Sequence, residues 1–241
     1  LDSTDSVTDA FTMTVSDGDA SDTMTVTITV TGANDAPDAG SNAVGAVTED
    51  ATATTATGTI SATDADDSAF TYTGDATGTY GSIAVASDGA WTYTLNNADA
   101  DTTALDSTDS VTDAFTMTVS DGDASDTMTV TITVTGANDA PDAGSNAVGA
   151  VTEDATATTA TGTISATDAD DSAFTYTGDA TGTYGAIAVA SDGAWTYTLN
   201  NADADTTALD STDSVTDAFT MTVSDGDASD TMTVTITVTG A

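Results

Sequence analysis

The chain has 241 residues, with 40 acidic side chains and no Lys, Arg, His or Cys. Because no basic side chain is present to neutralise phosphate, the composition argues against nucleic-acid binding and against direct attraction to an anionic membrane. The absence of Cys excludes disulfides and thiolate metal sites, and no apolar run is long enough to span a bilayer. Without side-chain ion pairs, every carboxylate must be solvated, screened or bound to a metal.

The first 33 residues predict two strands. Phe11, Met13 and Val15 alternate with Thr, and a second alternating run extends from Met24 to Val30. Alternation with period two is typical of a half-buried strand. The acidic segment 17–22 joins the two runs as a hairpin, which cannot bury its apolar face alone.

A repeat of 104 residues organises the rest. Residues 1–104 recur as 105–208 with one change, Ser82 to Ala186, and a third copy begins at Leu209. A period this long lets each copy bury its own core, so it predicts tandem domains. We expect residues 1–33 to be the C-terminal part of an incomplete unit, with complete units at 34–137 and 138–241. Either the chain is cut from a longer array, or the true domain boundary is permuted.

Alternating runs and turn signals predict seven strands in the first complete unit, and residues 138–241 repeat them. The predicted strands are 43–48, 58–63, 70–73, 80–86, 90–95, 111–120 and 127–135. Asp88-Gly89 is a tight hairpin signal and is read as a turn only. A long polar loop spans 96–110. Short alternating strands without a helical period indicate an all-β fold in which each unit is a two-sheet antiparallel sandwich.

The predicted core consists of the inward apolar positions of these strands. They are Ile60, Phe70, Tyr72, Ile83, Val85, Trp91, Tyr93, Leu95, Phe115, Met117, Val119, Met128, Val130, Ile132 and Val134.

The acidic residues are almost all Asp, since only Glu49 and Glu153 are Glu. A salt-adapted acidic surface would use Glu as readily as Asp, whereas turns and calcium loops favour the shorter Asp. The asymmetry favours clusters of calcium ligands over general surface charging, and both can operate together.

Four acidic clusters recur in each unit, together with an Asn-Asp pair in each linker, where a Pro stiffens the chain two residues later. An Asp-x-Asp spacing in an extended loop can turn two carboxylates toward one Ca²⁺. The predicted ligands are Asn34, Asp35, Glu49, Asp50, Asp64, Asp66, Asp67, Asp99, Asp101, Asp121, Asp123, Asn138, Asp139, Glu153, Asp154, Asp168, Asp170, Asp171, Asp203, Asp205, Asp225 and Asp227.

Several of these segments resemble known motifs. Residues 62–67 resemble the cadherin A-x-D-x-D motif, 120–122 the Asp-Gly turn before the last cadherin strand, and 135–141 the cadherin linker D-x-N-D-N-x-P. The runs 78–81 and 88–95, followed by 115–122 and 138–141, are similar to the VCBS repeats of giant bacterial RTX adhesins. The near-identical, base-free copies look in particular like the extender repeats of ice-binding adhesins from marine bacteria.

The resemblance implies an all-β fold of tandem immunoglobulin-like, cadherin-like Greek-key sandwiches joined end to end. It implies a calcium-rigidified stalk on the bacterial cell surface, a monomeric array whose partners are neighbouring repeats of the same chain. It implies several Ca²⁺ ions per repeat, including ions at the linkers. The residues implied at the junction of the complete units are Glu49, Asp50, loop oxygens near Asn96 and Asp99, then Asn138, Asp139, Asp168, Asp170 and Asp225.

The linker departs from the cadherin pattern, since Gly136 and Ala140 replace an Asp and an Asn. The cadherin L-D-R-E segment is also absent, with Leu95-Asn96-Asn97 in its place. These departures leave the number of ions at each junction open.

Two rival functions remain. A carboxylate-pair glycosidase is formally possible, but the recurrence of every acidic cluster in each copy fits structural ligands better than one active site. We therefore expect no enzyme activity. The outward Thr row of strand 127–135 could instead bind ice or glycan directly, although Thr is also the usual outward residue of a polar strand.

Overall fold

The computed structural model describes residues 1–241 and contains strands, turns and irregular segments without any helix. Consequently, no helix is available that is long and apolar enough to cross a membrane. Contacts within the chain divide it into two units. Unit 1 comprises Leu1–Asp99 with Ser110–Thr135, and unit 2 comprises Ala100–Asp109 with Gly136–Ala241.

Ten strands belong to unit 1. They are β1 (Ser6–Ser16), β2 (Ser21–Thr31), β3 (Ala43–Thr48), β4 (Thr55–Thr59), β5 (Thr71–Thr73), β6 (Ala76–Thr77), β7 (Gly81–Val85), β8 (Ala90–Leu95), β9 (Ser110–Ser120) and β10 (Ser125–Thr135). Eight belong to unit 2. They are β11 (Ala147–Thr152), β12 (Thr159–Thr163), β13 (Thr175–Thr177), β14 (Ala180–Thr181), β15 (Gly185–Val189), β16 (Ala194–Leu199), β17 (Ser214–Ser224) and β18 (Ser229–Thr239).

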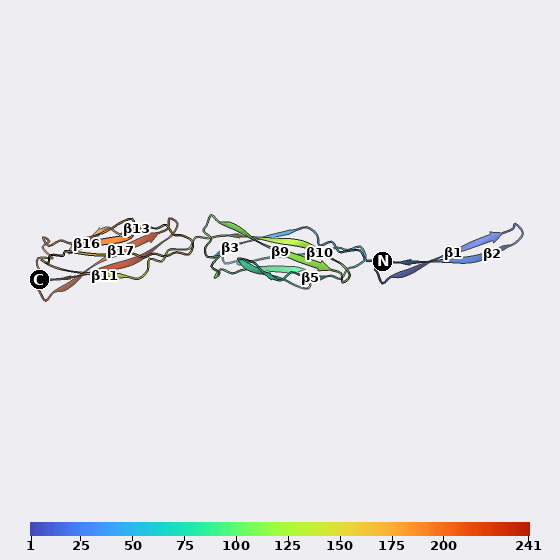
Figure 1. The fold of residues 1–241 in the computed structure, drawn as a ribbon, viewed down its shortest axis with the longest axis horizontal. Coiled ribbons are helices and arrows are strands. Elements are labelled where there is room, and N and C mark those ends of the chain that lie inside the picture. Colours follow the sequence, from blue (N-terminus) through green and yellow to red (C-terminus); the bar gives the residue numbers. More distant parts are fainter. The chain divides into compact units, whose positions relative to one another are not determined.

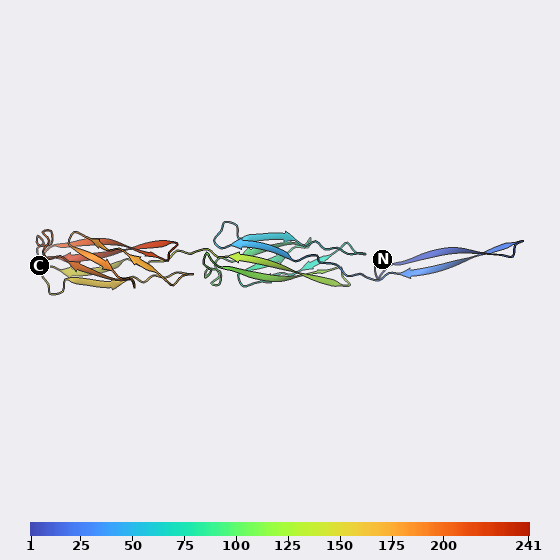
Figure 2. The same ribbon diagram turned by 90° about the horizontal axis from the view of Figure 1, so that it is seen from above.

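Each unit contains a sandwich of two four-stranded sheets. In unit 1 the strand orders are β3-β10-β9-β5 and β4-β8-β7-β6, and in unit 2 they are β11-β18-β17-β13 and β12-β16-β15-β14. All pairings are antiparallel except β3 with β10 and β11 with β18, which are parallel. Within each unit the strands of both sheets run along its length (Figures 1 and 2).

The remaining sheet of unit 1 is the two-stranded β1-β2 hairpin, paired from Ser6 with Thr31 to Ser16 with Ser21. It has the same sequence as the β9-β10 and β17-β18 hairpins. The predicted hairpin is therefore confirmed, including its acidic turn, where the Asp17 carboxylate accepts the amide of Ala20 at 2.8 Å.

The core lies between the two sheets, where the inward residues of the long strands are nearly inaccessible. Trp91 and Tyr93 of β8 are buried, and the rings of Tyr93 and Phe115, a residue of β9, are 5.9 Å apart. Such aromatic packing together with aliphatic burial supplies most of the stabilisation of a sandwich. The same arrangement recurs in unit 2, where the rings of Tyr197 and Phe219 are 5.8 Å apart.

The prediction of a strand over 58–63 was wrong in position, because β4 spans Thr55–Thr59. Gly58 pairs with Trp91 there, and a Cβ at position 58 would collide with the indole. Ile60 is buried but lies beyond the strand, and its amide donates to the carbonyl of Gly89 at 2.9 Å. The short Ala and Thr side chains of β4 gave little hydrophobic signal. The two-residue strand β6 was not predicted.

The core prediction also needs correction at Phe70, Tyr72 and Val85, which are only half-buried. Tyr72 lies on the three-residue edge strand β5, and Val85 ends β7, so the opposite sheet covers each of them incompletely. Val47 of β3 was missed, although it is buried against the core. The remaining core positions and the Asp88-Gly89 turn are confirmed.

A buried carboxylate was not predicted either. Asp113 occupies an inward position of β9 and is 4 % exposed. Its oxygens accept the amides of Thr79, Tyr80 and Gly81 at 2.9, 3.1 and 3.2 Å, and the hydroxyl of Tyr93 at 2.9 Å. Burial, followed by the bond to Asp113, raises the pKa of Tyr93, so this hydroxyl remains a donor. The carboxylate fixes the loop before β7 to the opposite sheet.

Replacing Asp113 with Ala removes the acceptor of four donors, two of them buried, and we expect it to lower the unfolding free energy by about 3 kcal/mol or more. Tyr93→Phe removes one of these donors and should cost about 1–2 kcal/mol. Thermal unfolding followed by circular dichroism measures both effects.

The matched control is Asp9→Ala, the same residue in the same sequence context, because Asp9 is exposed in β1. We expect it to change stability by less than about 0.5 kcal/mol. Equal effects of Asp9→Ala and Asp113→Ala would contradict a structural role for the buried carboxylate.

Candidate functional site

The linker after β10 contacts two acidic loops of unit 2. The Asn138 side-chain amide donates to the Asp225 carboxylate at 3.2 Å and to the carbonyl of Asp139. The backbone amide of Asp139 donates to the Asp170 carboxylate at 3.1 Å. One short segment therefore joins a loop and a hairpin turn that lie far apart in sequence.

Local sequence explains why the linker lies here. Pro141 is buried, fixes its own backbone and keeps the residue before it extended. The next residue, Asp142, exchanges two backbone hydrogen bonds with Thr167, at 2.8 and 3.1 Å. These bonds hold the linker beside the loop that begins at Asp168.

The same arrangement occurs in unit 1. Asn34 donates to the Asp121 carboxylate at 3.2 Å, and the amide of Asp35 donates to the Asp66 carboxylate at 3.3 Å. We call these sets the linker clusters. That of unit 1 comprises Asn34, Asp35, Asp64, Asp66, Asp67 and Asp121, and that of unit 2 comprises Asn138, Asp139, Asp168, Asp170, Asp171 and Asp225.

Asp225 divides its two oxygens between the turn and the linker. Its Oδ1 accepts the amides of Asp227 and Ala228, both at 2.7 Å, while Oδ2 faces Asn138. These bonds, that from Ala228 first, lower the pKa of Asp225 below its usual value. Asp225 is therefore held ionised, with one oxygen directed at the linker. Asp227 itself is exposed on the turn.

Several oxygens of the linker clusters are buried without a hydrogen-bond partner. In unit 2 they are Oδ2 of Asp168 and Oδ1 of Asp170, and in unit 1 they are Oδ1 of Asn34 and Oδ2 of Asp64. Buried acceptors without donors are costly. All of these atoms are hard oxygens, the ligand type that Ca²⁺ accepts.

Four carboxylates of the linker clusters have raised pKa values. Burial, then the hydrogen bond to Asp168 and its charge, raise the pKa of Asp170 to about 6. Burial also raises the pKa of Asp171, with the carboxylates of Asp225 and Asp168 as the next causes. In unit 1, burial raises the pKa of both Asp66 and Asp67. Ionisation of these four carboxylates is therefore disfavoured, whereas the hydrogen bond from the backbone amide of Asp66 lowers the pKa of Asp64.

One acidic residue near the unit 2 cluster was missing from the predicted ligands. The charge of Asp106 contributes to the raised pKa of Asp171. The loop that carries Asp106 packs on the linker, since the amide of Gly136 donates to the carbonyl of Asp109 at 3.1 Å. The sequence signal that could have identified this residue is the Asp-Ser-Thr-Asp run at 106–109. In the structure, Asp106 Oδ1 accepts the amide of Thr108 at 2.6 Å.

The predicted ligands Glu49 and Asp50 lie at the other end of the unit 1 sandwich. Glu49 is buried, and its amide donates to the carbonyl of Thr135, the last residue of β10, at 2.9 Å. Asp121 precedes the opposite end of that strand, and 11 residues of strand span roughly 35 Å. Asp50 adopts a left-handed conformation with φ of 51°. Glu153 and Asp154 occupy the equivalent place beside Thr239 in unit 2.

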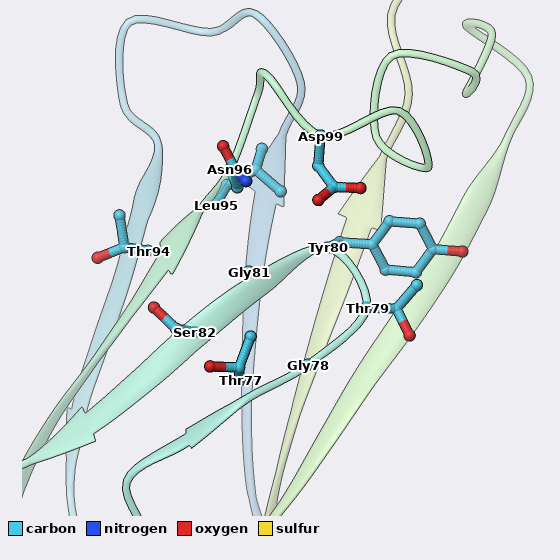
Figure 3. A pocket seen from close by; sticks show the side chains of 10 residues that line it. All are labelled: Thr77, Gly78, Thr79, Tyr80, Gly81, Ser82, Thr94, Leu95, Asn96 and Asp99. Carbon is cyan, nitrogen blue, oxygen red and sulfur yellow. The ribbon is translucent and has the colours of Figure 1, made fainter.

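Asp99 and Asp203 do not belong to the linker clusters. Each lines a hollow at the equivalent place in its own unit. In unit 1 the hollow measures about 340 Å³ and lies between the Tyr80-Gly81 backbone, Asn96 and Asp99, with the Tyr80 ring pointing away from Ser82 (Figure 3). In unit 2 it measures about 360 Å³ and includes Asp203. Ser82 and Ala186, the one difference between the copies, line the two hollows.

Asp101, Asp123 and Asp205 are exposed, so the structure does not gather them into the linker clusters. Nowhere does it group three carboxylates closely enough to hold a metal ion. The ligand assignments therefore remain predictions, supported at the linkers by the orphaned oxygens and raised pKa values.

The fold agrees with known cadherin domains. The chain is similar to Drosophila N-cadherin EC1-4, at 17% identity and a TM-score of 0.51, over 90% of this chain and 52% of that one. It also matches mouse protocadherin-24 EC1-3, at 16% identity and a TM-score of 0.48, over 97% of this chain and 80% of that one. At these identities the N-cadherin match supports the fold alone.

A further match is an endo-fucoidan hydrolase from glycoside hydrolase family 107, with a TM-score of 0.34 and 19% identity, over 99% of this chain and 34% of that one. The chain thus spans about a third of the hydrolase, and a score this low carries no argument about function. No curated protein sequence matches the chain.

The family comparison is more specific. The model of the bacterial cadherin-like domain matches residues 34–136 and again residues 138–240. These two matches include both linker clusters and every strand from β3 to β18. The chain therefore belongs to the family of bacterial cadherin-like domains.

Proposed function

We propose that the chain is a calcium-stiffened extender segment of a bacterial cell-surface adhesin. Its role is structural and non-catalytic, and it serves to hold a distal binding region away from the cell. The observation that carries the proposal is the linker cluster, in which buried oxygens lack donors in a chain that has no basic side chain.

The residues that would hold calcium in unit 2 are Asn138, Asp139, Asp168, Asp170 and Asp225. When bound, the ion supplies positive charge that no side chain of this protein provides. Asn138 and Asp139 belong to the connection that follows β10, whereas the other three belong to loops of the sandwich. An ion shared by both would restrict the backbone freedom of the connection, which is what an extender requires.

The repeat itself supports a spacer. Two copies of 104 residues differ at one position, so neither copy carries a distinct surface. A protein whose useful property is length can repeat one domain unchanged, because each added copy extends the array equally.

Calcium addition should both stabilise and extend the chain. If calcium binds only the folded protein, each site adds about 1.4 kcal/mol at roughly ten times its Kd, which raises the melting temperature of a domain this size by roughly 5–10 °C. Small-angle scattering should show a larger maximum dimension in calcium than in chelator.

The control for this experiment is NaCl or MgCl₂ at matched ionic strength. General screening of an acidic surface would give the same effect with every salt, whereas specific ligation favours Ca²⁺. A scattering profile that is identical in chelator and in calcium would rule out the stiffening role.

The variant Asp170→Asn should change stability in opposite directions with and without calcium. Since folding raises the pKa of Asp170 to about 6, its contribution to stability is complete below about pH 4 and is lost as the pH rises through 6. In chelator at pH 7 the neutral Asn should therefore stabilise unit 2, by at most about 1 kcal/mol after solvent screening. In saturating calcium the variant lacks a ligand and should melt below the wild type.

The matched control is Asp192→Asn, which makes the same change of charge in an exposed turn. Asp192 accepts the amide of Ala194 at 3.1 Å through an oxygen that Asn retains. Calorimetry of both variants at pH 7 in chelator and in calcium gives the comparison. A shift of the same sign for Asp170→Asn in both conditions would refute its assignment as a ligand.

A further inference from the structure

Each sandwich exposes one large apolar side chain on its first strand. Val44 of β3 and Val148 of β11 are each 81 % exposed, and every other exposed large apolar residue of the chain lies within residues 1–30. Because the exposure occurs in both units, it is a property of the domain and does not depend on the residues that precede it.

The strand that carries this side chain is an unpaired edge. β3 is the outermost strand of its sheet and pairs with β10 alone. The amide of Glu49, directly after β3, donates to β10 at the carbonyl of Thr135. Since the N–H and C=O of successive residues point to alternate sides of a strand, those of Val44, Ala46 and Thr48 point away from β10. β3 therefore presents a row of unpaired N–H and C=O groups.

This edge lacks the features that ordinarily prevent strands from pairing, which are charges, Pro, bulges or very short length. β3 has six residues, Ala-Val-Gly-Ala-Val-Thr, without a charge or a Pro. The opposite edge of the same sheet, β5, has only three residues. β4, an edge of the second sheet, has no large apolar side chain. Among the edges of the sandwich, β3 is thus the one suited to accept another strand.

We propose that β3 and β11 pair laterally with a second copy of this chain, through an antiparallel ladder centred on Ala46, or on Ala150 in unit 2. In this register Ala46 lies opposite its counterpart, and Val44 lies opposite Thr48 of the copy. Each outward N–H and C=O of the strand then has a partner. The exposed Val gains a β-branched neighbour across the ladder.

The charges near the strand favour a second copy in this orientation. Glu49 and Asp50 follow β3, whereas the uncharged Ser41 and Asn42 precede it. In the antiparallel ladder the acidic end of each copy lies beside the neutral end of the other, with Asp50 opposite Asn42. A parallel ladder would place the Asp50 carboxylates of both copies side by side, which is unfavourable.

A copy also satisfies both edges at once. It supplies a strand of the same length with the same unpaired groups and the same exposed Val, so one two-fold contact covers the edge of each molecule. The sheets of the two copies would merge into one continuous sheet. Such pairing joins chains side by side and differs from the monomeric array that the resemblance implies.

The first test measures self-association of the full chain by light scattering over a concentration series in 1 M NaCl, where the acidic surfaces are screened beyond about 3 Å. Calcium is kept at one concentration, so bridging by the ion affects all variants equally. All chains carry Phe11→Asp, because the exposed apolar face of β1-β2 is a rival contact. We expect the average mass to rise with concentration above that of one chain.

A proline at the centre of the ladder should prevent pairing. Ala46→Pro together with Ala150→Pro removes an N–H that points away from β10 or β18, so the pairing within each sheet keeps its bonds. The contact between copies loses its two central bonds, and the proline ring occupies the place of the partner strand. We expect self-association to weaken by about tenfold or more.

The matched control puts proline in the edge strand of the other sheet. It is Thr57→Pro in β4 together with Thr161→Pro in β12. The amide of Ile60, three residues after Thr57, donates toward β8 at the carbonyl of Gly89, so the Thr57 amide points away from β8. This variant should leave self-association within about threefold of the parent chain.

Introduced cysteines report the register, because the chain has no Cys of its own. In Ala46→Cys with Ala150→Cys, the paired Cα atoms would lie about 5.5 Å apart, a distance that a disulfide spans. Mild oxidation should link two chains. In Val44→Cys with Val148→Cys the thiols of the two copies would be separated by four residues of strand, roughly 13 Å, and should not link.

Three results would each overturn the proposal. The first is a parent chain that circular dichroism shows folded but that stays monomeric up to about 1 mM. The second is equal self-association of the parent chain and the Ala46→Pro variant, which would place the contact elsewhere. The third is equal linking of the Val44→Cys and Ala46→Cys variants, which would exclude a ladder centred on Ala46.

Discussion

The constraint on which the structure depends is that its carboxylates have no basic side chain to pair with. The charge of a buried carboxylate in this protein can be stabilised in two ways: by hydrogen bonds from backbone amides and hydroxyls, or by a cation taken up from the solvent. Asp113 uses the first, with three amides and Tyr93 around it. Asp168 and Asp170 lack enough donors, since each keeps one buried oxygen without a partner. The acidic residue that supports the fold therefore differs from those of the candidate site in how its charge is stabilised.

Sequence reasoning predicted the strands whose side chains alternate in size and polarity. The hairpins corresponding to β9 and β10 were clear because Phe, Met, Val and Ile alternate with Thr. It misplaced β4, where the strand is built from Thr, Ala and Gly and its register depends on the indole of Trp91. It also missed Asp113, since an Asp within an alternating strand is ordinarily assigned to solvent. What places that residue inside is a loop more than 30 residues away in sequence.

The residue types of the candidate site could be predicted from the sequence, but which of these residues lie close together could not. The Asn-Asp linker and the Asp-x-Asp loop were recognised from spacing, and the structure brings Asp139 to Asp170. Spacing could not show that Glu49 and Asp121 lie near opposite ends of β10, because this separation follows from the parallel pairing of β3 with β10. Nor could it place Asp106 near Asp171, since the loop that carries Asp106 reaches the linker through backbone bonds.

Three copies of one hairpin sequence separate local from tertiary effects. β1-β2 adopts the same register as β9-β10 and β17-β18, so the sequence and its turn are sufficient to specify pairing. Burial differs completely, because it depends on the strands that cover the face. The same reasoning applies to Asp9 and Asp113, one exposed and the other enclosed by donors. The hairpin sequence therefore buries its carboxylate only where the loop before β7 packs against it, as it does around Asp113.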